Sequence, residues 1–426
     1  MKKAGIVSIG NELLNGQTVG TNAAYLGEKL LSIGIPVVCS YTIGDDIDSI
    51  VRALKLSTND ADVVITTGGL GPTDDDLTRQ AMAKFLGAEL QLQDNLLQKI
   101  KDFFASRERQ MPENNKVQAY IPAGAKAITN NHGTAPGIMA EASGKLIFAL
   151  PGVPSEMKQM VEESVLPELK KLARLPLGMA KSITSVGQAV GQSIVLRKLN
   201  CFGAGESSIA ELLGPLMRRA RNPLINCTVH FGIITLTIIA TAENKNRACQ
   251  MAEKDEKLLR STLGELVYGT DEQTLAEVVG EKLAQQGKTL AVAESCTGGT
   301  LAKLLTDIPG ASRYFRYGWI TYSNDAKTSE LGVPAELIEK YGAVSEEVAL
   351  AMARCARRKA GADFAIATTG IAGPTGATEQ KRVGLVYISV DSSDGAETKC
   401  FTFSYDRNFV RLMAAQTALN MLRLRL

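Results

Sequence analysis

Apolar and polar positions along the first 172 residues follow two alternating periods, which predicts strands separated by helices. The strands, short apolar runs rich in β-branched residues, are expected at Ala4–Ile9, Val37–Ile43 and Asp62–Thr66. The helices are expected at residues 21–33, 46–55, 75–86, 93–105 and, beginning at Pro154, as far as about 172. Residues 117–150 are rich in strands and turns. This alternation is typical of a parallel sheet with right-handed helical crossovers.

The pattern changes after residue 172 and returns to the first type after about 265. Residues 229–241 are β-rich and 246–263 form an amphipathic helical stretch, which predicts a small α+β module. Residues 186–199 mix glycines with β-branched residues and predict no single element. The last third is α/β again, with helices expected at 274–286, 297–306, 346–360 and 407–424, and strands at 289–293, 317–322, 363–368, 383–390 and 398–403. We therefore expect domains at 1–172, 173–264 and 265–426.

Composition narrows the class of protein. A chain of 426 residues suits two or three domains, and 45% hydrophobic with 22% charged residues suits folded domains with real cores. The net charge of +2 gives no global reason to expect a nucleic-acid partner, and no apolar run approaches a membrane span. Seven scattered cysteines without a Cys-x-x-Cys pair indicate reduced thiols. We expect a cytoplasmic protein without nucleic-acid or membrane partners.

A turn that bears a hydroxyl joins the strand at 289–293 to the helix at 297–306. It reads Ala-Glu-Ser-Cys-Thr-Gly-Gly over residues 293–299, and it places Ser295 beside the free N–H groups of a helix start. Such a serine is well placed to act as a nucleophile. The simpler interpretation is that Thr297 caps the helix and that the glycines permit close packing. The turn alone leaves both interpretations open.

A nucleophilic serine needs a base, and both histidines of the chain lie far upstream of this turn. A lysine is therefore the more suitable partner for Ser295. Lys327 is the leading candidate because it closes the polar cluster Tyr-Ser-Asn-Asp-Ala-Lys at residues 322–327. Backbone N–H groups around Thr297–Thr300 could then hold an oxyanion. The glycine-rich loop at 370–376 could hold a phosphate, or it could be a tight structural turn.

A second glycine-rich loop follows the strand at 62–66. Gly68, Gly69 and Gly71 allow backbone N–H groups to approach an anion closely. Three aspartates follow, and they repel one another unless they are exposed or neutralised by a cation. A divalent metal shared with substrate phosphates is one solution, and a helix cap with two solvated acids is the other. Loops at 10–16 and 151–156 belong to the same sheet edge, so we expect one crevice whose candidate metal ligands are Asp74, Asp75, Asp76, Glu12 and Glu156.

Several motifs resemble known families. Gly-Gly-Leu-Gly-Pro-Thr-Asp-Asp-Asp at 68–76, Gly-Asn-Glu-Leu-Leu at 10–14 and Pro-Gly-Val-Pro-Ser-Glu-Met at 151–157 resemble the molybdopterin-binding domain family. The last third is similar to stand-alone nicotinamide-nucleotide amidases, through the turn at 293–299, the cluster at 322–327, Gly-Ile-Ala-Gly-Pro-Thr-Gly at 370–376 and the pair Arg407 and Arg411. The middle, with Gly-Glu-Ser-Ser-Ile-Ala-Glu at 205–211, resembles a KH-like linker domain.

The whole chain, end to end, resembles the CinA family. The resemblance implies a three-layer molybdopterin-binding-like α/β domain, a small KH-like α+β domain and a C-terminal α/β amidase domain. It departs at Ala377, where the family often has a further glycine, and in a segment 176–200 that is longer than usual.

The resemblance also implies activities. The C-terminal domain would convert nicotinamide mononucleotide (NMN) to nicotinic acid mononucleotide and ammonia without a cofactor, and the N-terminal domain would hydrolyse ADP-ribose with a divalent cation. The family's catalytic roles fall on Ser295, Lys327 and Arg411. The expected NMN-binding residues are Thr297, Gly298, Gly299, Tyr322, Asn324, Gly370, Gly373, Thr375 and Gly376, and Gly68, Gly69 and Gly71 would bind ADP-ribose. A homodimer is expected. Two alternatives stay open: the N-terminal domain binds a pterin or nucleotide without cleaving it, or the chain is a binding scaffold linked to competence.

Overall fold

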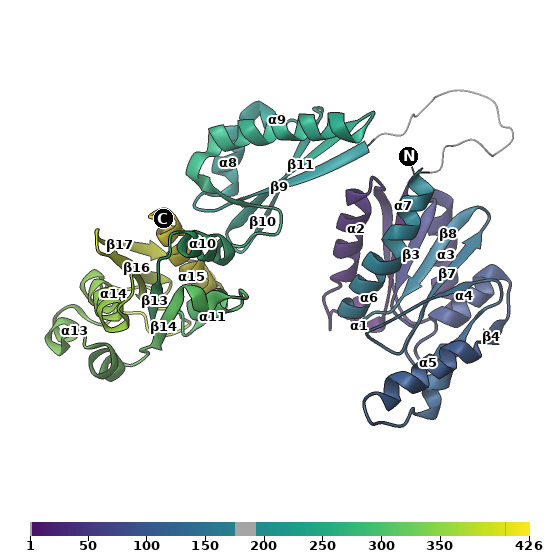
Figure 1. Cartoon of the computed structure of the whole chain (residues 1–426), viewed down its shortest axis with the longest axis horizontal. Coiled ribbons are helices and arrows are strands. Elements are labelled where there is room, and N and C mark those ends of the chain that lie inside the picture. Colours follow the sequence, from purple (N-terminus) through teal and green to yellow (C-terminus); the bar gives the residue numbers. More distant parts are fainter. Residues whose placement is uncertain (1, 175–192, 405) are drawn as a thin grey trace. The chain divides into compact units, whose positions relative to one another are not determined.

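The computed structural model describes residues 2–174, 193–404 and 406–426 (Figure 1). The chain divides into two compact units. The first contains Met1–Val195 with Thr241–Ala248, and the second contains Leu196–Ala240 with Cys249–Leu426. Residues 176–192 of the long segment noted in the sequence lie outside the described residues.

A six-stranded sheet forms the centre of the first unit. Its strand order is β2-β1-β3-β8-β7-β6. The parallel strands are β1 (Ala4–Ile9), β2 (Val37–Ile43), β3 (Val63–Thr67) and β8 (Lys145–Leu150). The antiparallel strands are β7 (Gly137–Ala142) and β6 (Lys126–Ile128). The strands expected at 4–9, 37–43 and 62–66 are therefore present, and their carboxyl ends meet at one edge of the sheet.

Two layers of helices cover this sheet, which gives the expected three-layer arrangement (Figure 1). One face packs against α3 (Ile47–Asp60), α4 (Thr78–Leu86) and α5 (Asp94–Ala105). The other face packs against α2 (Asn22–Ser32), α6 (Pro154–Met160) and α7 (Leu166–Arg174). Pro154 opens α6 as expected, since its missing N–H and fixed φ suit a first helical position. A π-helical turn (Val161–Val165) joins α6 to α7.

Short elements complete this unit. They are α1 (Asn11–Leu14), the two-stranded sheet of β4 (Leu90–Leu92) and β5 (Tyr120–Pro122), and a 3₁₀ turn at Glu113–Ala119.

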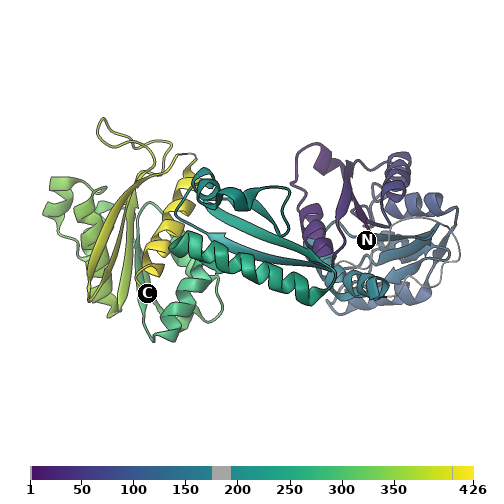
Figure 2. The same ribbon diagram turned by 90° about the horizontal axis from the view of Figure 1, so that it is seen from above.

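The second unit begins with a small antiparallel sheet of order β10-β11-β9-β12. Its strands are β9 (Ser193–Cys201), β10 (Leu224–His230), β11 (Ile233–Ala242) and β12 (Val267–Thr270). From Cys249 onward, α9 (Lys245–Leu263) runs along this sheet (Figure 2), and Arg197 of β9 pairs with Glu253 and Glu256 of the helix. Short helical elements are α8 (Glu206–Leu213) and the turns Gly214–Met217 and Gly264–Leu266. Of the ambiguous residues 186–199, 186–192 lie outside the described residues and 193–199 belong to β9.

The last third is a five-stranded sheet of order β14-β13-β15-β16-β17. Its parallel part is β13 (Leu290–Glu294), β14 (Phe315–Ile320) and β15 (Phe364–Gly370). Strands β16 (Leu385–Ser392) and β17 (Gly395–Thr402) continue it antiparallel. Glu294 is in register with both Ile320 and Thr368, so the carboxyl ends of the three parallel strands lie side by side.

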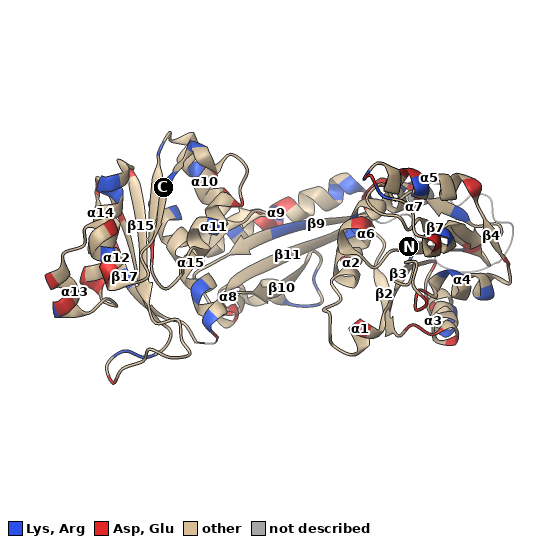
Figure 3. Cartoon of the chain, turned by 90° about the horizontal axis from the view of Figure 1, so that it is seen from below, with Lys and Arg blue, Asp and Glu red and all other residues tan. Residues whose placement is uncertain are grey.

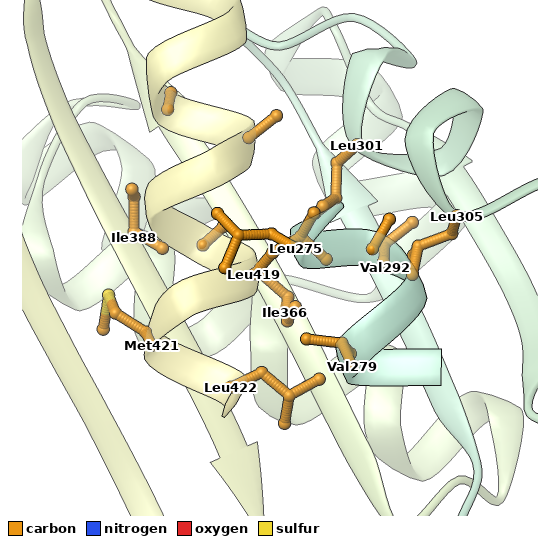
Figure 4. Close-up of a cluster of buried hydrophobic side chains, with 14 of the residues drawn as sticks. Leu275, Val279, Val292, Leu301, Leu305, Ile366, Ile388, Leu419, Met421 and Leu422 are labelled. Carbon is orange, nitrogen blue, oxygen red and sulfur yellow. The ribbon is translucent and has the colours of Figure 1, made fainter. Parts of the chain in front are cut away.

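Helices cover both faces of this sheet. One face packs against α10 (Leu275–Gln285), α11 (Thr300–Thr306) and α15 (Arg407–Arg423), whose apolar side chains meet in the cluster of Figure 4. The other face packs against α13 (Ala335–Tyr341) and α14 (Glu346–Ala360). Short turns include Ala311–Arg313, α12 (Asn324–Ala326) and a π-helical turn at Lys327–Leu331. Within the described residues, no helix is both long and apolar enough to cross a membrane.

Candidate functional site

A buried serine and a buried lysine meet at the carboxyl edge of the C-terminal sheet. Ser295 follows β13 directly, and Lys327 begins the π-helical turn that follows α12. The Lys327 Nζ lies 3.0 Å from the Ser295 Oγ and 2.9 Å from the Thr321 carbonyl oxygen. The exposed fraction is 8% for Ser295 and 1% for Lys327. The proximity that a serine–lysine pair requires is therefore present.

The environment of Lys327 favours the neutral amine. Burial lowers the pKa of Lys327 below its ordinary value, because removal from water penalises the charged form; a weaker influence of Cys296 opposes the shift. Among the described residues, no carboxylate forms an ion pair with Lys327. A neutral amine can donate to the Thr321 carbonyl and still offer its lone pair to the serine hydroxyl.

A cavity of about 180 Å³ opens beside this pair. It is lined by Ser295, Cys296, Tyr322, Asn324, Lys327, Ala343, Val344, Thr369, Gly370, Ala372 and Arg407. The reactive pair is buried, whereas Tyr322 is 60% exposed and Arg407 is also exposed. The cavity therefore has a buried end with the hydroxyl and amine and an open end with the phenol and guanidinium.

The helix start beside Ser295 is held by a carboxylate that the sequence interpretation did not use. Glu294 is fully buried, and its carboxylate accepts from the backbone N–H groups of Gly299 (2.8 Å), Leu301 (3.1 Å) and Ala302 (2.7 Å). The helix begins at Thr300, with Gly299 as its N-cap residue, and Thr297 instead places its hydroxyl 2.7 Å from that of Thr368. The alternative interpretation, in which Thr297 caps this helix, is therefore wrong, and so is the predicted helix start at residue 297.

These contacts also correct the expected oxyanion site. The N–H of Gly298 donates to Ser295, that of Thr300 to Thr297, and that of Gly299 to Glu294. Three of the donors expected around 297–300 are therefore engaged within the turn. Gly298 and Gly299 serve the turn by their positive φ angles of 56° and 95°, which residues with a Cβ rarely adopt.

The two arginines of α15 lie differently with respect to the cavity, and Arg411, to which the resemblance assigned a catalytic role, does not line it. Arg411 donates from Nε (3.0 Å) and Nη2 (2.9 Å) to the Thr297 carbonyl oxygen and is not among the residues that line the cavity. Arg407 lines the cavity and donates to the Gly373 carbonyl and the Tyr322 hydroxyl, each at 2.8 Å. Arg411 therefore holds the turn, and Arg407 is the arginine that faces the open end.

The glycine-rich loop after β15 reaches the cavity only at its beginning. Gly370 and Ala372 line it, whereas Gly373, Thr375 and Gly376 do not, and Gly373 presents a carbonyl to Arg407. Of the nine expected NMN-binding residues, the cavity lining contains Tyr322, Asn324 and Gly370. Thr297, Gly298 and Gly299 build the turn behind Ser295.

A second cavity, of about 400 Å³, lies at the carboxyl edge of the N-terminal sheet. Its lining includes Gly68, Gly69 and Gly71 and the carboxylates Glu12, Asp45, Asp75, Asp76 and Glu156, and it includes no lysine, arginine or histidine among the described residues. The three strand-end loops thus share one crevice, as expected. Asp74 is not part of the lining, and Asp45 was not anticipated.

The glycine-rich loop of this cavity is tied together internally. The Asp76 carboxylate accepts from the N–H of Gly71 (2.7 Å) and from the N–H and hydroxyl of Thr73, so it caps the loop and not a helix. The N–H of Gly68 donates to Leu150, so of the three glycines only Gly69 keeps an N–H for which no partner is recorded. The guanidinium of the buried Arg79 also donates to the carbonyl oxygens of Leu70 and Gly71 in this loop.

The expected ligands do not form a ready metal cage. Among the described residues, no three His, Cys, Asp or Glu side chains gather closely enough to hold a metal ion. Asp76 is occupied by the loop, Asp75 accepts from the Thr73 hydroxyl at 2.5 Å, and Glu156 accepts from Asn130 at 2.7 Å.

Comparison with known families matches most of the described residues to three family models. A model described as a probable molybdopterin binding domain matches residues 5–171, the KH domain of damage-inducible protein CinA matches 196–269, and the CinA C-terminal domain matches 272–426. A relative from Caldicellulosiruptor saccharolyticus, named as a competence-damage inducible protein, is 43% identical over 420 residues, which cover 99% of this chain and 98% of the relative. The chain belongs to the CinA family.

Two further comparisons also find similar CinA-family proteins. A CinA-like protein from Kosmotoga olearia is 43% identical over 421 residues, covering 99% of this chain and 98% of that protein. A solved structure of a CinA protein of unknown function from Thermoplasma acidophilum is 35% identical, covers 40% of this chain and 98% of that structure, and has a TM-score of 0.37. The Ser295 cavity falls in the part matched to the CinA C-terminal domain, and the acidic cavity in the part matched to the molybdopterin-binding domain.

Proposed function

We propose that the C-terminal domain of this CinA-family protein deamidates NMN to nicotinic acid mononucleotide and ammonia, with Ser295 as nucleophile and Lys327 as base. The observation that carries the proposal is the 3.0 Å contact between the Lys327 Nζ and the Ser295 Oγ at the buried end of a cavity. An activated hydroxyl beside a base is the arrangement that attack on an amide carbon requires.

The chemistry proceeds in two halves. In the first half, the Ser295 Oγ bonds to the carboxamide carbon while its proton passes to the neutral Lys327 amine. That proton is then delivered to the amide nitrogen, the C–N bond breaks, and ammonia leaves an ester on Ser295. In the second half, water adds to the ester carbon as Lys327 takes its proton, and the return of this proton to the Ser295 Oγ releases the acid.

Of the four oxyanion donors first expected, only the Thr297 N–H is not engaged within the turn. The backbone N–H groups of Cys296 and Thr297 follow the nucleophile directly; they have no recorded backbone acceptor and face the Cys296 sulfur, which is a weak acceptor. We assign them as the donors, each of which would be worth roughly 3 kcal/mol of transition-state stabilisation. Arg411 supports this assignment indirectly, because it holds the Thr297 carbonyl and with it the peptide geometry of the turn.

Cys296 is the rival nucleophile next to Ser295. Burial raises the pKa of the Cys296 thiol to about 12, so the reactive thiolate is scarce at neutral pH. Lys327 also contacts the serine oxygen at 3.0 Å, and no hydrogen bond joins it to the thiol. Both facts favour the serine.

The proposal is tested by product analysis. The purified full-length protein is incubated with NMN, and the nucleotide products and ammonia are quantified by mass spectrometry and an ammonia assay. The expected result is nicotinic acid mononucleotide and ammonia in equal amounts. Intact NMN after prolonged incubation with an excess of enzyme contradicts the proposal.

For the N-terminal domain we propose hydrolysis of the ADP-ribose pyrophosphate with a divalent cation. The support is the charge of the 400 Å³ cavity, whose lining has five carboxylates and, among the described residues, no basic side chain. A pyrophosphate would be repelled there unless a cation accompanied it. A hydrated ion that takes one or two carboxylates and the substrate phosphates fits this lining better than a protein-only cage.

The chain's own residues divide the remaining tasks. The lining carboxylates that do not tie the glycine-rich loop together would be available to such a cation, whose chemistry would be to polarise a phosphoryl oxygen; they are Glu12, Asp45, Asp75 and Glu156. Asp76 and Arg79 hold the glycine-rich loop in shape. Binding of a pterin or nucleotide without cleavage is the alternative. AMP and ribose 5-phosphate from ADP-ribose plus a divalent salt support hydrolysis, and unchanged ADP-ribose that nevertheless binds supports the alternative.

A further inference from the structure

The turn between β10 and β11 contains a residue that its backbone geometry disfavours. Strand β10 ends at His230 and β11 begins at Ile233, so Phe231 and Gly232 alone form the turn. Their φ angles are 46° and 77°, and a two-residue turn with both angles positive favours Asn-Gly or Asp-Gly. A bulky side chain is rarely found at positive φ, and Phe231 is also 44% exposed. Neither the local backbone preference nor burial in a core accounts for a phenylalanine here.

The start of α15 is what this turn contacts. The ring centroid of Phe231 lies 6.2 Å from that of Phe409 and 4.4 Å from that of His230. A Cβ atom at Gly232 would lie 2.5 Å from both the Sδ and the Cε atoms of Met413, so the turn backbone lies directly against this thioether. The turn and the helix belong to the same compact unit. The middle sheet therefore reaches the helix that also serves the Ser295 site.

The two arginines of the Ser295 site lie on the other side of the same helix. At about 100° per residue, Phe409 and Met413 share one face of α15. Arg407 and Arg411 share a face that is rotated from it by about half a turn. On that face Arg411 donates to the Thr297 carbonyl, and Arg407 lines the cavity. The first turns of α15 are thus held between the β10–β11 turn and the turn that carries the nucleophile.

We propose that Phe231 is a positioning residue for the amidase reaction, which acts through Phe409 to fix the rotation and axial position of the start of α15. The inference rests on the proposed function for the identity of the reaction. A residue in a disfavoured backbone conformation is retained where its side chain has a task, and here the task is to keep Arg411 on the Thr297 carbonyl. The middle domain then contributes to the geometry of the amidase site and is more than a linker.

The variant Phe231→Asn separates positioning from folding. Asparagine is a residue that this turn favours, so the unfolding temperature of the full-length variant should stay within about 3 °C of that of the wild type. Loss of the ring should lower kcat for ammonia release from NMN about 5- to 20-fold and leave KM within about threefold. The effect is expected in kcat because the turn that Arg411 holds carries the proposed oxyanion donors, which act in the transition state.

Matched variants show whether the effect passes through the contact with α15. Phe231→Tyr keeps an aromatic ring and should retain kcat within about twofold of the wild type. Val229→Thr changes a residue of β10 that is 49% exposed and should leave kcat unchanged. Phe409→Ala should lower kcat as Phe231→Asn does, and the double variant should lose no more than either single variant, because both remove the same contact.

Hydrogen–deuterium exchange without substrate tests the same contact independently of turnover. The backbone amides of residues 407–413 should exchange faster in Phe231→Asn than in the wild type or in Val229→Thr. Wild-type kcat in folded Phe231→Asn, or additive losses in the double variant, overturns the positioning role and leaves the proposed deamidation intact. If the wild-type protein releases no ammonia from NMN, the proposed deamidation fails. Faster exchange in Phe231→Asn then upholds the hold on α15, and unchanged exchange overturns it.

Discussion

At the scale of single residues, Lys327 shows a conflict between stability and chemistry. Its amine is almost fully buried and contacts only a hydroxyl and a carbonyl, so the charged form lacks the compensation that buried ions need. The same burial lowers the pKa of Lys327 and makes the amine available as a base. A position that costs folding free energy therefore supplies the reactive group.

The pH dependence of activity follows from this direction of shift. We expect kcat/KM for NMN to rise as pH increases through the lowered pKa of Lys327, because only the neutral amine accepts the serine proton. Lys327→Arg stays protonated and should lose at least about 100-fold at every pH. Initial rates between pH 5 and pH 10 measure both effects. A rate that falls through this range before the protein unfolds would contradict the assignment of the base.

Stability should depend on pH through the same group. The pKa of Lys327 is lower in the folded chain, so between the folded and the unfolded pKa the unfolded chain binds more protons. Below the folded pKa the lysine is charged in both states, and the folded state then bears the full free-energy cost of burying the charged amine. Lys327→Met should therefore unfold at a higher temperature than the wild type at low pH, with a gap that narrows as pH approaches 10.5. Each 1 kcal/mol corresponds to about 2 to 4 °C.

Thermal unfolding of both proteins across this pH range provides the measurement. Lys303→Met is the matched control, since Lys303 is exposed and paired with Asp307. A gap that is constant with pH, or that is matched by the control, would show that the amine of Lys327 is not the cause.

At the scale of elements, the Ser295 turn is held by two side chains, one from the residue before the serine and one from the terminal helix. Glu294 binds the N–H groups at the start of α11, and Arg411 of α15 binds the carbonyl of Thr297. Turn, helix start and terminal helix thus form one hydrogen-bonded assembly around the nucleophile.

Removal of the Glu294 carboxylate should be costly. Glu294→Ala leaves three backbone N–H groups without an acceptor, two of them on helical residues, and a buried donor without a partner costs about 1 to 3 kcal/mol. We expect a loss of at least about 2 kcal/mol and a parallel loss of NMN turnover. Denaturant unfolding of the full chain measures the first, and Thr306→Ala, at the exposed end of the same helix, should change stability by only about 0.5 kcal/mol. Equal stability of the two variants would exclude the capping role.

The sequence predicted most elements because their signals are local. Short apolar runs predicted the strands β1, β13 and β15, and Pro154 predicted the start of α6. The start of α11 was misplaced because threonine is a favoured capping residue, whereas the actual acceptor, Glu294, reaches forward from the end of a strand.

The other wrong predictions concern which of several residues of the same type has a given position in the site. Arg407 and Arg411 lie four residues apart on one helix, and which of them faces the cavity depends on how α15 is rotated against the sheet. Likewise, Asp76 is distinguished from Asp74 and Asp75 by the loop N–H of Gly71, which donates to its carboxylate. These distinctions come from tertiary packing, which no local pattern encodes.

At the scale of the whole molecule, the two units hold cavities of opposite electrostatic character. The N-terminal cavity is lined by carboxylates, whereas the C-terminal cavity has the Arg407 guanidinium and, among its described lining residues, no carboxylate. Acidic and basic residues are otherwise interspersed along the elements of both units (Figure 3). The short basic cluster Arg-Arg-Ala-Arg at residues 218–221 is partly neutralised, since Arg221 pairs with the buried Asp255 at 2.6 Å.

This difference predicts two separable activities. Removal of divalent cations with EDTA should abolish ADP-ribose cleavage. The rate of ammonia release from NMN should stay within about twofold of the rate without EDTA, because no step of the serine–lysine mechanism uses a metal. Ser295→Ala should show the converse pattern. Both activities are measured on one preparation, and readdition of a divalent salt serves as the control. ADP-ribose cleavage that survives EDTA would contradict the cation's role.

The central claim is that the Ser295 hydroxyl and the Lys327 amine form the hydrolytic pair, and ammonia release from NMN by matched variants tests it most directly. Ser295→Ala and Lys327→Met should each lose at least about 1,000-fold in kcat, whereas Cys296→Ser, which changes the neighbouring buried thiol, should stay within about tenfold of the wild type. Circular dichroism establishes that the variants are folded. Near-normal ammonia release by folded Ser295→Ala or Lys327→Met would contradict the account.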